Sequence, residues 1–401
     1  MGAGLGLADM RVQVFGTYDA ARHPRVGIIA TGLRGSGVPV DECNAPLGFT
    51  TADRVAMLAK PWRAPLLIGR IARRWATLAR RSRRLPRPDA VIVGYLGHFD
   101  VHLARVLYRR VPLVLDHLIG ASDTARDRRI AGGVRQLLLR AIDAAALRAA
   151  DVVVVDTEEH LAALPPRHRA RGMVVAVGAP AEWFDAAPAP GQGNASPLKV
   201  VFFGLYTPLQ GAPVIGAALR ALAGAPVAVT MIGRGQDEAE TRRLAAGNPS
   251  VTWLDWISPD ELPAVVAAHD VCLGIFGTGA KALRVVANKV FQGAAAGCAI
   301  VTSDTPPQRR LLGDAAVYVA PGDPAALAEA LRGLAGDPAE LARRRSATYR
   351  LAREEFTAER IVRPLLAHLT RQHPDEATLE PAVPEQAATE QTISRRNGER
   401  S

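Results

Sequence analysis

Three cations surround the start of one short predicted helix in the second half of the chain. Lys281, Arg284 and Lys289 lie in FGTGAKALRVVANKVFQGAAAG (residues 276–297), directly after an apolar run. Cations near a helix N-terminus oppose the helix dipole, unless an anion is bound there. Helix amides and cationic side chains together make a phosphate site, so this segment favours phosphate binding. Side chains that merely point into solvent are the alternative.

Two glycine-containing loops are expected at the same edge of the second half. GLYTPLQG (residues 204–211) begins with Gly204 and would let backbone N–H groups approach an anion, and IGRGQ places Arg234 between two glycines. In parallel sheets, ligands bind beyond the carboxyl ends of the strands, where such loops and helix N-termini converge. We therefore expect all three loops to line one site.

The first half carries polar side chains in equivalent places. Gly16 opens GTYDAARHP (residues 16–24), and His98 and Asp100 lie in GYLGHFD (residues 94–100). His98 and Asp100 could act as an acid, a base or hydrogen-bonding groups toward a substrate, or could have structural roles only. Asp116, with His117 and Asp123 nearby, forms a further polar lip whose functional weight is lower.

The elements that position these residues alternate apolar strands with amphipathic helices, which predicts parallel sheets covered by helices on both faces. The stretch AAPAPGQGNASP (residues 186–197) is a linker by composition, so the fold class is α/β with two Rossmann-like domains, 10–185 and 198–355. A helix over 356–370 follows and could pack back on the first domain, and 371–401 reads as a disordered tail. The predicted strands are 11–17, 38–44, 90–95, 112–118, 151–157 and 173–178, then 199–205, 227–233, 251–256, 270–276, 299–304 and 316–321.

Length and composition allow two folded cores and limit the class of protein. The chain has 401 residues, 48% of them hydrophobic, with no apolar run of about 20 residues and no signal-peptide pattern at its start. We therefore expect a cytoplasmic protein. Three scattered cysteines favour reduced thiols, and neither they nor the nine histidines show metal-ligand spacing.

The formal net charge of +10 predicts an anionic partner, and much of it lies in one segment. Residues 60–88 hold ten cations and no Asp or Glu, with Leu67, Ile71, Trp75 and Leu78 at helical spacing. This pattern fits a helix on an anionic membrane surface and, equally, a surface helix that packs its apolar stripe on its own domain. Nucleic-acid binding is disfavoured, because no recognised motif accompanies the charge.

The chain resembles the family-4 (group 1) glycosyltransferases of the GT-B fold, which have two Rossmann-like domains facing across a cleft. VFGTYD, IVGYLGHFD, VVVDTEEH, VFFGLYTPLQG, MIGRGQ and ANKVFQGAAAG carry the resemblance. It implies a nucleotide-diphosphate sugar donor in the second domain, a hydroxyl acceptor in the first, retention of configuration, and no metal or cofactor. The roles expected are diphosphate binding by Lys281, Arg284, Lys289, Gly204 and Arg234, ribose binding by Gln292, catalysis by His98 and Asp100, and an acceptor-side loop at Gly16 and Asp116.

The sequence departs from the family pattern in three ways. Gln210 stands where a basic residue is common, Arg284 and Gln292 stand where two glutamates are common, and Ala287 replaces a proline. A GT-B sugar epimerase and a catalytically degenerate sugar-nucleotide-binding protein therefore remain alternatives. If 60–88 contacts a membrane, the resemblance suggests a lipid-linked acceptor, a cell-envelope glycan product and attachment to the inner face of the plasma membrane.

Overall fold

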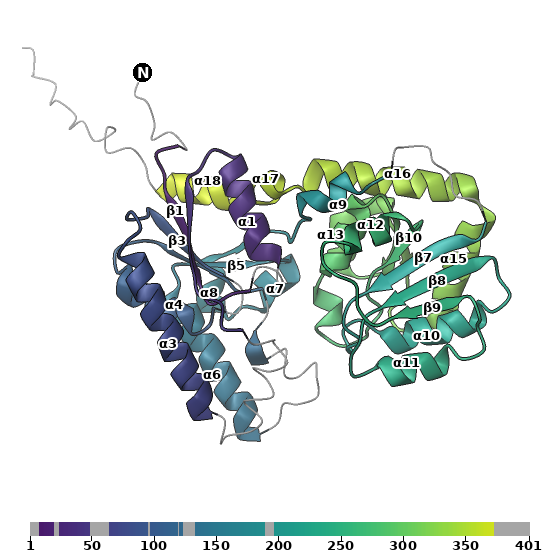
Figure 1. Ribbon diagram of the computed structural model, residues 1–401, viewed down its shortest axis with the longest axis horizontal. Helices are drawn as coiled ribbons and strands as arrows, with labels where there is room; N and C mark the ends of the chain where they lie inside the picture. The colour runs from purple at the N-terminus through teal and green to yellow at the C-terminus, as the bar shows by residue number, and fades with distance from the viewer. Residues whose placement is uncertain are drawn as a thin grey trace, which may run out of the picture.

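The computed structural model describes residues 8–19, 24–48, 64–94, 97–118, 120–122, 133–188 and 196–372. Lys60, Arg63, Asp123 and residues 373–401 of the predicted tail lie outside these ranges. Figure 1 shows two α/β domains side by side, connected along one side by helices. The predicted fold class is confirmed, because each domain is built on a sheet of six parallel strands.

The first sheet has the strand order β2-β1-β3-β4-β5-β6. The chain order reverses between β1 and β3, which pair directly, so the carboxyl ends of these two strands form the topological switch point where ligands bind in such sheets. The strands are β1 (Val12–Gly16), β2 (Val40–Asn44), β3 (Ala90–Val93), β4 (Leu113–Asp116), β5 (Val152–Val155) and β6 (Gly172–Val174). The helices are α1 (Pro24–Gly35), α3 (Ala64–Ser82), α4 (Asp100–Leu107), α6 (Gly133–Ala149), α7 (Glu158–Ala163) and α8 (Pro166–Arg169).

The second sheet has the order β12-β11-β10-β7-β8-β9, which is the six-stranded Rossmann order with its switch point between β7 and β10. Its strands are β7 (Leu198–Phe203), β8 (Val227–Ile232), β9 (Val251–Leu254), β10 (Val271–Leu273), β11 (Ala299–Ser303) and β12 (Val317–Val319). Its helices are α10 (Ala212–Ala221), α11 (Glu238–Leu244), α12 (Leu262–Ala267), η2 (Ala282–Arg284), α13 (Asn288–Ala295), α14 (Pro306–Leu312), η3 (Gly313–Ala315), α15 (Pro324–Gly336) and α16 (Pro338–Glu355).

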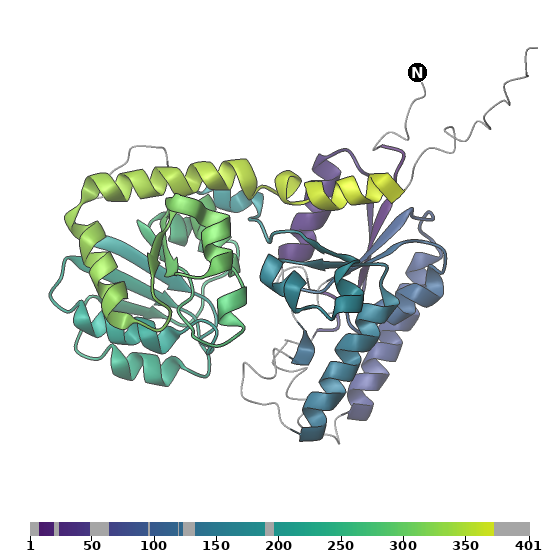
Figure 2. The same cartoon turned by 180° about the vertical axis from the view of Figure 1, so that it is seen from behind.

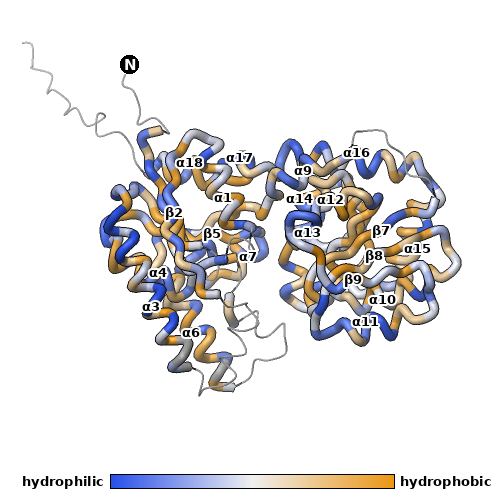
Figure 3. Tube along the Cα trace, viewed as in Figure 1, coloured by the Kyte–Doolittle hydropathy of each residue, from blue (hydrophilic) through white to orange (hydrophobic). Residues whose placement is uncertain are grey.

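A strand forms in each of the twelve predicted runs, although β6 ends at Val174, before most of its predicted range. In β3, β4 and β5 every residue is buried, which is why these strands read as continuous apolar runs and not as alternating ones. Figure 3 shows the hydrophobic colour gathered on the strands inside each domain and the hydrophilic colour on outer helices such as α11.

The chain passes between the domains twice, and both passages use helices. Helix α9 (Ala181–Asp185) belongs by sequence to the first domain but packs into the core of the second, where Trp183 stacks on Phe203 at 5.5 Å between ring centroids. Helices α17 (Ala358–Ile361) and α18 (Arg363–Gln372) return to the first domain and bury Ile361 and Leu365 there. Figures 1 and 2 show α16, α17 and α18 as the connection along one side of both domains.

Helix α3 resolves the two interpretations of the basic segment in part. Leu78 is fully buried and Trp75 packs against the same core cluster, so this part of the apolar stripe lies on its own domain. The arginines that line the other side of α3 are exposed. In the part of the chain that the structure describes, no helix combines the length and apolar character that crossing a membrane needs.

Candidate functional site

The three loops predicted to line one site meet at the switch point of the second sheet. The loop after β7 is joined to the loop after β10 by a hydrogen bond from the Phe276 amide to the Gln210 carbonyl, 3.0 Å long. It is joined to the loop after β8 by a bond of 3.0 Å from the Tyr206 amide to the Arg234 carbonyl. The carboxyl ends of β7, β8 and β10 therefore form one continuous polar surface.

Two glycines allow this close approach. Gly211 has φ +66°, and a Cβ added there would lie 2.4 Å from the carbonyl carbon of Phe276. Gly204 has φ +134°, and a Cβ there would lie 3.3 Å from Nζ of Lys289. The first glycine fastens two loops together, and the second leaves space beside a cation.

Lys289 is the cation at the centre of this surface. It lies in the first turn of α13 and is 4% exposed. Its Nζ donates a 2.7 Å hydrogen bond to Oε1 of Gln210 and lies 3.6 Å from the ring centroid of Phe202. Burial lowers the pKa of Lys289 from its ordinary value to about 7. No carboxylate of the described residues forms an ion pair with this ammonium group.

The other two cations of the predicted site precede α13. Lys281 and Arg284 lie at η2 and are half-buried. Nε of Arg284 donates to the Ala280 carbonyl at 2.9 Å, and the Arg284 carbonyl accepts a hydrogen bond from Thr157 of the first domain. Arg284 is thus placed at the contact between the domains.

The start of α13 has no side-chain cap. Asn288 is the first helical residue, and the capping position is Ala287, whose side chain accepts no hydrogen bond. The first amides of α13 therefore lack a side-chain acceptor from the cap, and such amides are suited to an anion. Gln292 lies one helical turn after Lys289 and is half-buried, so the two side chains occupy the same face of α13.

Arg234 has a different environment from the one predicted. Its guanidinium is 68% exposed and forms an ion pair with Asp255, which follows β9. The hydrogen bond to Asp255 raises the pKa of Arg234 above its ordinary value. A diphosphate role for Arg234 would require this pair to open or to be shared.

In the first domain, Asp100 ties together the two strands of the switch point. Oδ2 of Asp100 accepts hydrogen bonds from the amide and hydroxyl of Thr17, at 2.7 and 2.8 Å, and Oδ1 accepts one from Trp75 of α3 at 2.9 Å. A Cβ on Gly16 would lie 3.2 Å from the same carboxylate. Asp100 and Gly16 are thus brought together, and these hydrogen bonds give Asp100 a positioning role.

His98 belongs to a buried cluster that the sequence showed only in part. Nε2 of His98 lies 3.2 Å from Oδ1 of Asp143, a separation suited to an ion pair, although the geometry is not that of a hydrogen bond donated by Nε2. The ring of His98 meets that of His117 edge to face at 5.3 Å. Burial lowers the pKa of His117 to about 3, with a further contribution from His98, so His117 is neutral at neutral pH.

Asp143 was not predicted, because a single aspartate within a helical stretch carries no motif. Its carboxylate accepts hydrogen bonds from the amides of Ala121 and Ser122, at 2.9 and 3.0 Å. Burial alone would raise its pKa, but the interaction with His98 and these amides together lower it to about 2. A permanently ionised Asp143 is suited to orient the ring of His98.

Asp116 lies deeper than the predicted acceptor-side loop. It is 2% exposed, and its Oδ1 accepts a 2.8 Å hydrogen bond from Nε of Arg25 on α1. Arg25 also donates to the carbonyls of Val175 and Ala176. Burial raises the pKa of Asp116 against the opposing effect of Arg25. These contacts give Asp116 a structural role, and its acceptor-side role stays a prediction.

The two domains contact each other through α7, a connection that the sequence did not reveal. The Thr157 hydroxyl donates a 2.7 Å hydrogen bond to the Arg284 carbonyl, and Glu159 forms a two-pronged ion pair with Arg310 at 2.9 and 3.0 Å. Thr157 and Glu159 follow β5, while Arg284 and Arg310 follow β10 and β11. The carboxyl edges of the two sheets therefore face each other at this contact.

The described residues contain no group of three or more His, Cys, Asp and Glu side chains that could hold a metal ion.

Comparison with known proteins shows a family similarity in the second domain. Residues 197–337 match the family model described as glycosyl transferases group 1. A comparison with curated protein sequences gives no significant match.

Several solved structures share the fold over nearly the whole chain. HepE of Anabaena, solved with UDP-glucose, is 16% identical with a TM-score of 0.60, over 90% of this chain and 100% of that one. Sucrose-phosphate synthase of Thermosynechococcus elongatus is 14% identical with a TM-score of 0.66, over 90% and 98% of the two chains. A UDP-forming α,α-trehalose-phosphate synthase of Burkholderia vietnamiensis is 16% identical with a TM-score of 0.61, over 90% and 98%. The chain therefore has the GT-B fold, and residues 197–337 of its second domain match the group 1 glycosyltransferase family model.

Proposed function

We propose that the protein transfers a sugar from a nucleotide-diphosphate sugar to a hydroxyl acceptor, giving a glycoside and a nucleoside diphosphate. The observation that carries the proposal is the buried Lys289 ammonium, placed beside Gly204 at the β7/β10 switch point of a group 1 glycosyltransferase domain. HepE, which shares the fold, was solved with UDP-glucose, so UDP-sugars are the first donors to test.

The chemistry that this site supports is stabilisation of a leaving diphosphate. Negative charge develops on the diphosphate as the bond to the sugar breaks, and a fixed cation with helix amides lowers that barrier. We assign this role to Lys289 and the amides of α13, with Lys281, Arg284 and Arg234 as outer cations and Gln292 as the ribose ligand. We further propose, as in the family-4 resemblance, that configuration is retained and that no metal or cofactor takes part.

A donor panel tests the proposal directly. The purified full-length protein is incubated with nucleotide sugars, with small hydroxyl acceptors and with membrane extracts, and release of nucleoside diphosphate is measured. Transfer or donor hydrolysis that persists in EDTA supports a metal-independent transferase, and the anomeric signal of the product by NMR reports retention or inversion. If the protein neither turns over nor binds any donor of the panel, the proposal is overturned.

Two alternatives are separated by the same experiment. A sugar epimerase would change the donor sugar without an acceptor, which NMR of the sugar detects. A catalytically degenerate protein would bind a donor in calorimetry without turnover under any acceptor. The Arg284 and Gln292 positions, where glutamates are common in relatives, motivate both alternatives.

For the acceptor side, we propose His98 and Asp100 as the groups nearest the reacting hydroxyl, with Gly16 and Asp116 in the supporting loops. The pair with Asp143 fixes the orientation of the His98 ring. A side chain that exchanges a hydrogen bond with a substrate hydroxyl needs such a fixed orientation. His98→Ala is expected to reduce transfer with little effect on donor affinity. Equal loss of donor affinity would remove His98 from this role.

We also propose that the first domain contacts an anionic membrane and takes a lipid-linked acceptor, as in cell-envelope glycan synthesis. In Figures 1 and 2, α3 and α6 extend side by side from this domain. They expose Ile68 at 65%, Val134 at 85%, Leu137 at 68% and Leu138 at 53%, next to the arginines of α3. Apolar side chains beside cations suit an anionic bilayer surface.

Liposome sedimentation tests this attachment. The protein should pellet with vesicles that contain phosphatidylglycerol and stay in the supernatant with pure phosphatidylcholine, and Val134→Glu with Leu137→Glu should abolish pelleting. Recovery in the supernatant with both kinds of vesicle rejects the membrane contact.

A further inference from the structure

Gln210 places its side-chain amide directly against the buried cation at the β7/β10 switch point. Oε1 of Gln210 accepts the 2.7 Å hydrogen bond from Nζ of Lys289, which lies 79 residues further along the chain. An ammonium group has three donors and no acceptor, so only the oxygen of the amide can face it. The loop after β7 and the helix α13 therefore meet through this one pair of side chains.

The backbone of Gln210 is fixed on both sides, so its side chain starts from a defined place. Its amide donates to the Thr207 carbonyl at 2.9 Å, and its carbonyl accepts from the Phe276 amide at 3.0 Å. The next residue, Gly211, has φ +66° and fits closely against the Phe276 backbone. All of these residues lie in the uninterrupted described range 196–372. The loop therefore holds the amide acceptor in place.

The other contacts of the Lys289 ammonium are not directional. Nζ lies 3.6 Å from the ring centroid of Phe202, and this buried ring packs edge to face on Tyr206 at 5.6 Å. A cation over a ring is attracted to the whole ring face and not to one atom. Gly204 has no side chain that could cover the ammonium. Because a lysine side chain is long and flexible, the hydrogen bond to Gln210 is the contact that fixes the position of Nζ.

The residue that fixes the ammonium is also neutral, which leaves the charge of Lys289 uncompensated. No carboxylate of the described residues forms an ion pair with Lys289. Cys272 of β10 is the titratable group that acts on Lys289 within the described part of the chain. Burial raises the pKa of the Cys272 thiol to about 12, so it is uncharged at neutral pH. A carboxylate at position 210 would instead form an ion pair and use the charge that an anion needs.

We propose that Gln210 is a positioning residue for donor binding: its amide oxygen holds the Lys289 ammonium at the switch point and, being neutral, leaves its charge to the diphosphate. A charge-assisted hydrogen bond to a neutral oxygen fixes the ammonium without cancelling its charge. The inference rests on the proposed transferase function, since it takes the ligand to be the diphosphate of a sugar nucleotide. It adds that the residue at position 210 sets how tightly the donor binds and over which pH range.

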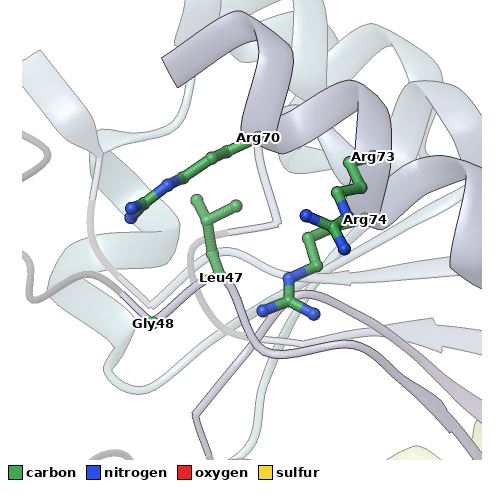
Figure 4. Close-up of a pocket in the computed structure, with 5 residues that line it drawn as sticks. All are labelled: Leu47, Gly48, Arg70, Arg73 and Arg74. Carbon is green, nitrogen blue, oxygen red and sulfur yellow. The ribbon is translucent and has the colours of Figure 1, made fainter. Parts of the chain in front are cut away.

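Titration of Lys289 in the full-length protein without ligand tests the contact first. NMR of protein labelled with carbon-13 lysine follows each side chain across neutral pH, and the signal lost in Lys289→Gln is that of Lys289. The cations of α3 do not interfere, because they are all arginines, among them the Arg70, Arg73 and Arg74 that Figure 4 shows. The whole chain has only four lysines, which are Lys60, Lys199, Lys281 and Lys289.

Two substitutions of Gln210 should move this titration in opposite directions. Gln210→Glu places a carboxylate beside the ammonium and should move the midpoint at least about one pH unit higher. Gln210→Met removes the acceptor and should move the midpoint lower, because the charged form of Lys289 loses a hydrogen bond. The matched control, Gln236→Glu, adds the same charge at an exposed position after β8 and should leave the midpoint in place. An unchanged midpoint in both Gln210 variants, or an equal change in the control, overturns the inference.

Donor binding is then measured by calorimetry with a UDP-sugar. Gln210→Glu should bind it at least about tenfold more weakly than the wild type, because the new carboxylate pairs with the ammonium and repels the diphosphate. An exchange variant, Gln210→Lys with Lys289→Gln, carries the ammonium on the loop, within about one hydrogen-bond length of its original place. It should bind the donor more tightly than Lys289→Gln alone, a recovery that a merely structural role of Gln210 would not produce.

The inference and the proposed function fail separately in these experiments. If the wild type and Gln210→Glu bind the donor equally well, or if the exchange variant binds no better than Lys289→Gln, the role of Gln210 is overturned and the proposed function stands. If no donor binds to the wild type, the proposed function fails, whereas the titration of Lys289 still decides whether Gln210 holds the ammonium.

Discussion

At the residue scale, the environment of Lys289 sets what this side chain can do. An ammonium group in solution is charged far above neutral pH, but burial lowers the pKa of Lys289 to about 7. Within the described part of the chain, Nζ donates its hydrogen bond to the neutral Gln210, and no carboxylate there supplies a compensating charge. A diphosphate would supply that charge, and its binding would raise the pKa of Lys289.

Donor affinity should therefore depend on pH through this one residue. Below pH 7 the ammonium is charged before the donor arrives, whereas above pH 7 binding must take up a proton, so affinity should fall by up to about tenfold per pH unit. The measurement is calorimetry with a UDP-sugar from pH 6 to pH 8.5, because a diphosphate diester does not titrate in that range. Repeating it in buffers of different ionisation enthalpy counts the proton. Lys289→Met should bind weakly with no slope, and an unchanged slope in this variant would contradict the assignment.

Lys289 also has a defined effect on stability. Its pKa is about 7 in the folded protein and near 10.4 in an unfolded chain, so the unfolded state binds more protons between these values. The stability of the free protein should rise with pH in this window and be lowest, with respect to this group, below pH 7. The gain in melting temperature of Lys289→Met over the wild type should therefore be larger at pH 6 than at pH 9. A gain that does not depend on pH would show that Lys289 is not desolvated.

At the element scale, one buried arginine fastens α1 to two strands. Arg25 pairs with Asp116 at the end of β4 and donates to the carbonyls after β6, while Arg34 of the same helix forms an exposed pair with Glu42. Arg25→Met leaves the Asp116 carboxylate buried without its partner, which should cost about 3–5 kcal/mol in the free energy of unfolding. Arg34→Met should cost roughly 0–1 kcal/mol. Urea unfolding of the intact protein measures both, and similar losses would contradict a special role for the buried pair.

The contact between the loops after β7 and β10 depends on Gly211, and Gly224 provides a matched control for its substitution. Gly211 and Gly224 both have positive φ, but a Cβ at Gly224 meets nothing within 4 Å, whereas one at Gly211 meets the Phe276 backbone. Gly224→Ala should cost only the strain of the left-handed conformation, about 1–2 kcal/mol. Gly211→Ala should cost more and should also weaken donor binding, because it separates the loops around Lys289. Equal thermal shifts and equal donor affinity in the two variants would count against this junction.

How much of this could be predicted depends on the range of the interactions. Each of the twelve strands is a local apolar run, so the fold class and the loops at the carboxyl edges followed from the sequence. Lys289 was placed at the site because it follows a buried strand. Its contact with Gln210 joins residues 79 apart in the sequence, and the pair of Asp116 with Arg25 joins residues 91 apart. Neither contact could be predicted from the neighbouring sequence. Asp143 and Glu159 were missed for the same reason.

At the scale of the whole molecule, the fold brings two candidate centres together from separate domains. His98 and Asp100, which we propose for the acceptor side, lie at the β1/β3 switch point, and Lys289, which we propose for the donor side, lies at the β7/β10 switch point. Two chain passages on one side join the domains, and α7 supplies contacts between the carboxyl edges. The arrangement therefore depends on few interactions, and their removal should alter domain orientation more than stability.

The ion pair of Glu159 with Arg310 allows the effect of the α7 contact on domain orientation to be tested. Partial burial opposes ionisation of Glu159, but the hydrogen bond from Arg310 outweighs it and lowers the pKa of Glu159 below its ordinary value. Glu159→Gln should change the free energy of unfolding by roughly 0–1 kcal/mol, because the pair is partly solvated. It should nevertheless shift the population toward more open arrangements, seen as a larger radius of gyration in X-ray scattering and a several-fold higher KM for the donor. The matched control is Asp304→Asn, which breaks the Arg309 pair on the same helix without touching the first domain. If scattering and KM are the same in the two variants, the contact through α7 does not hold the domains in their facing orientation.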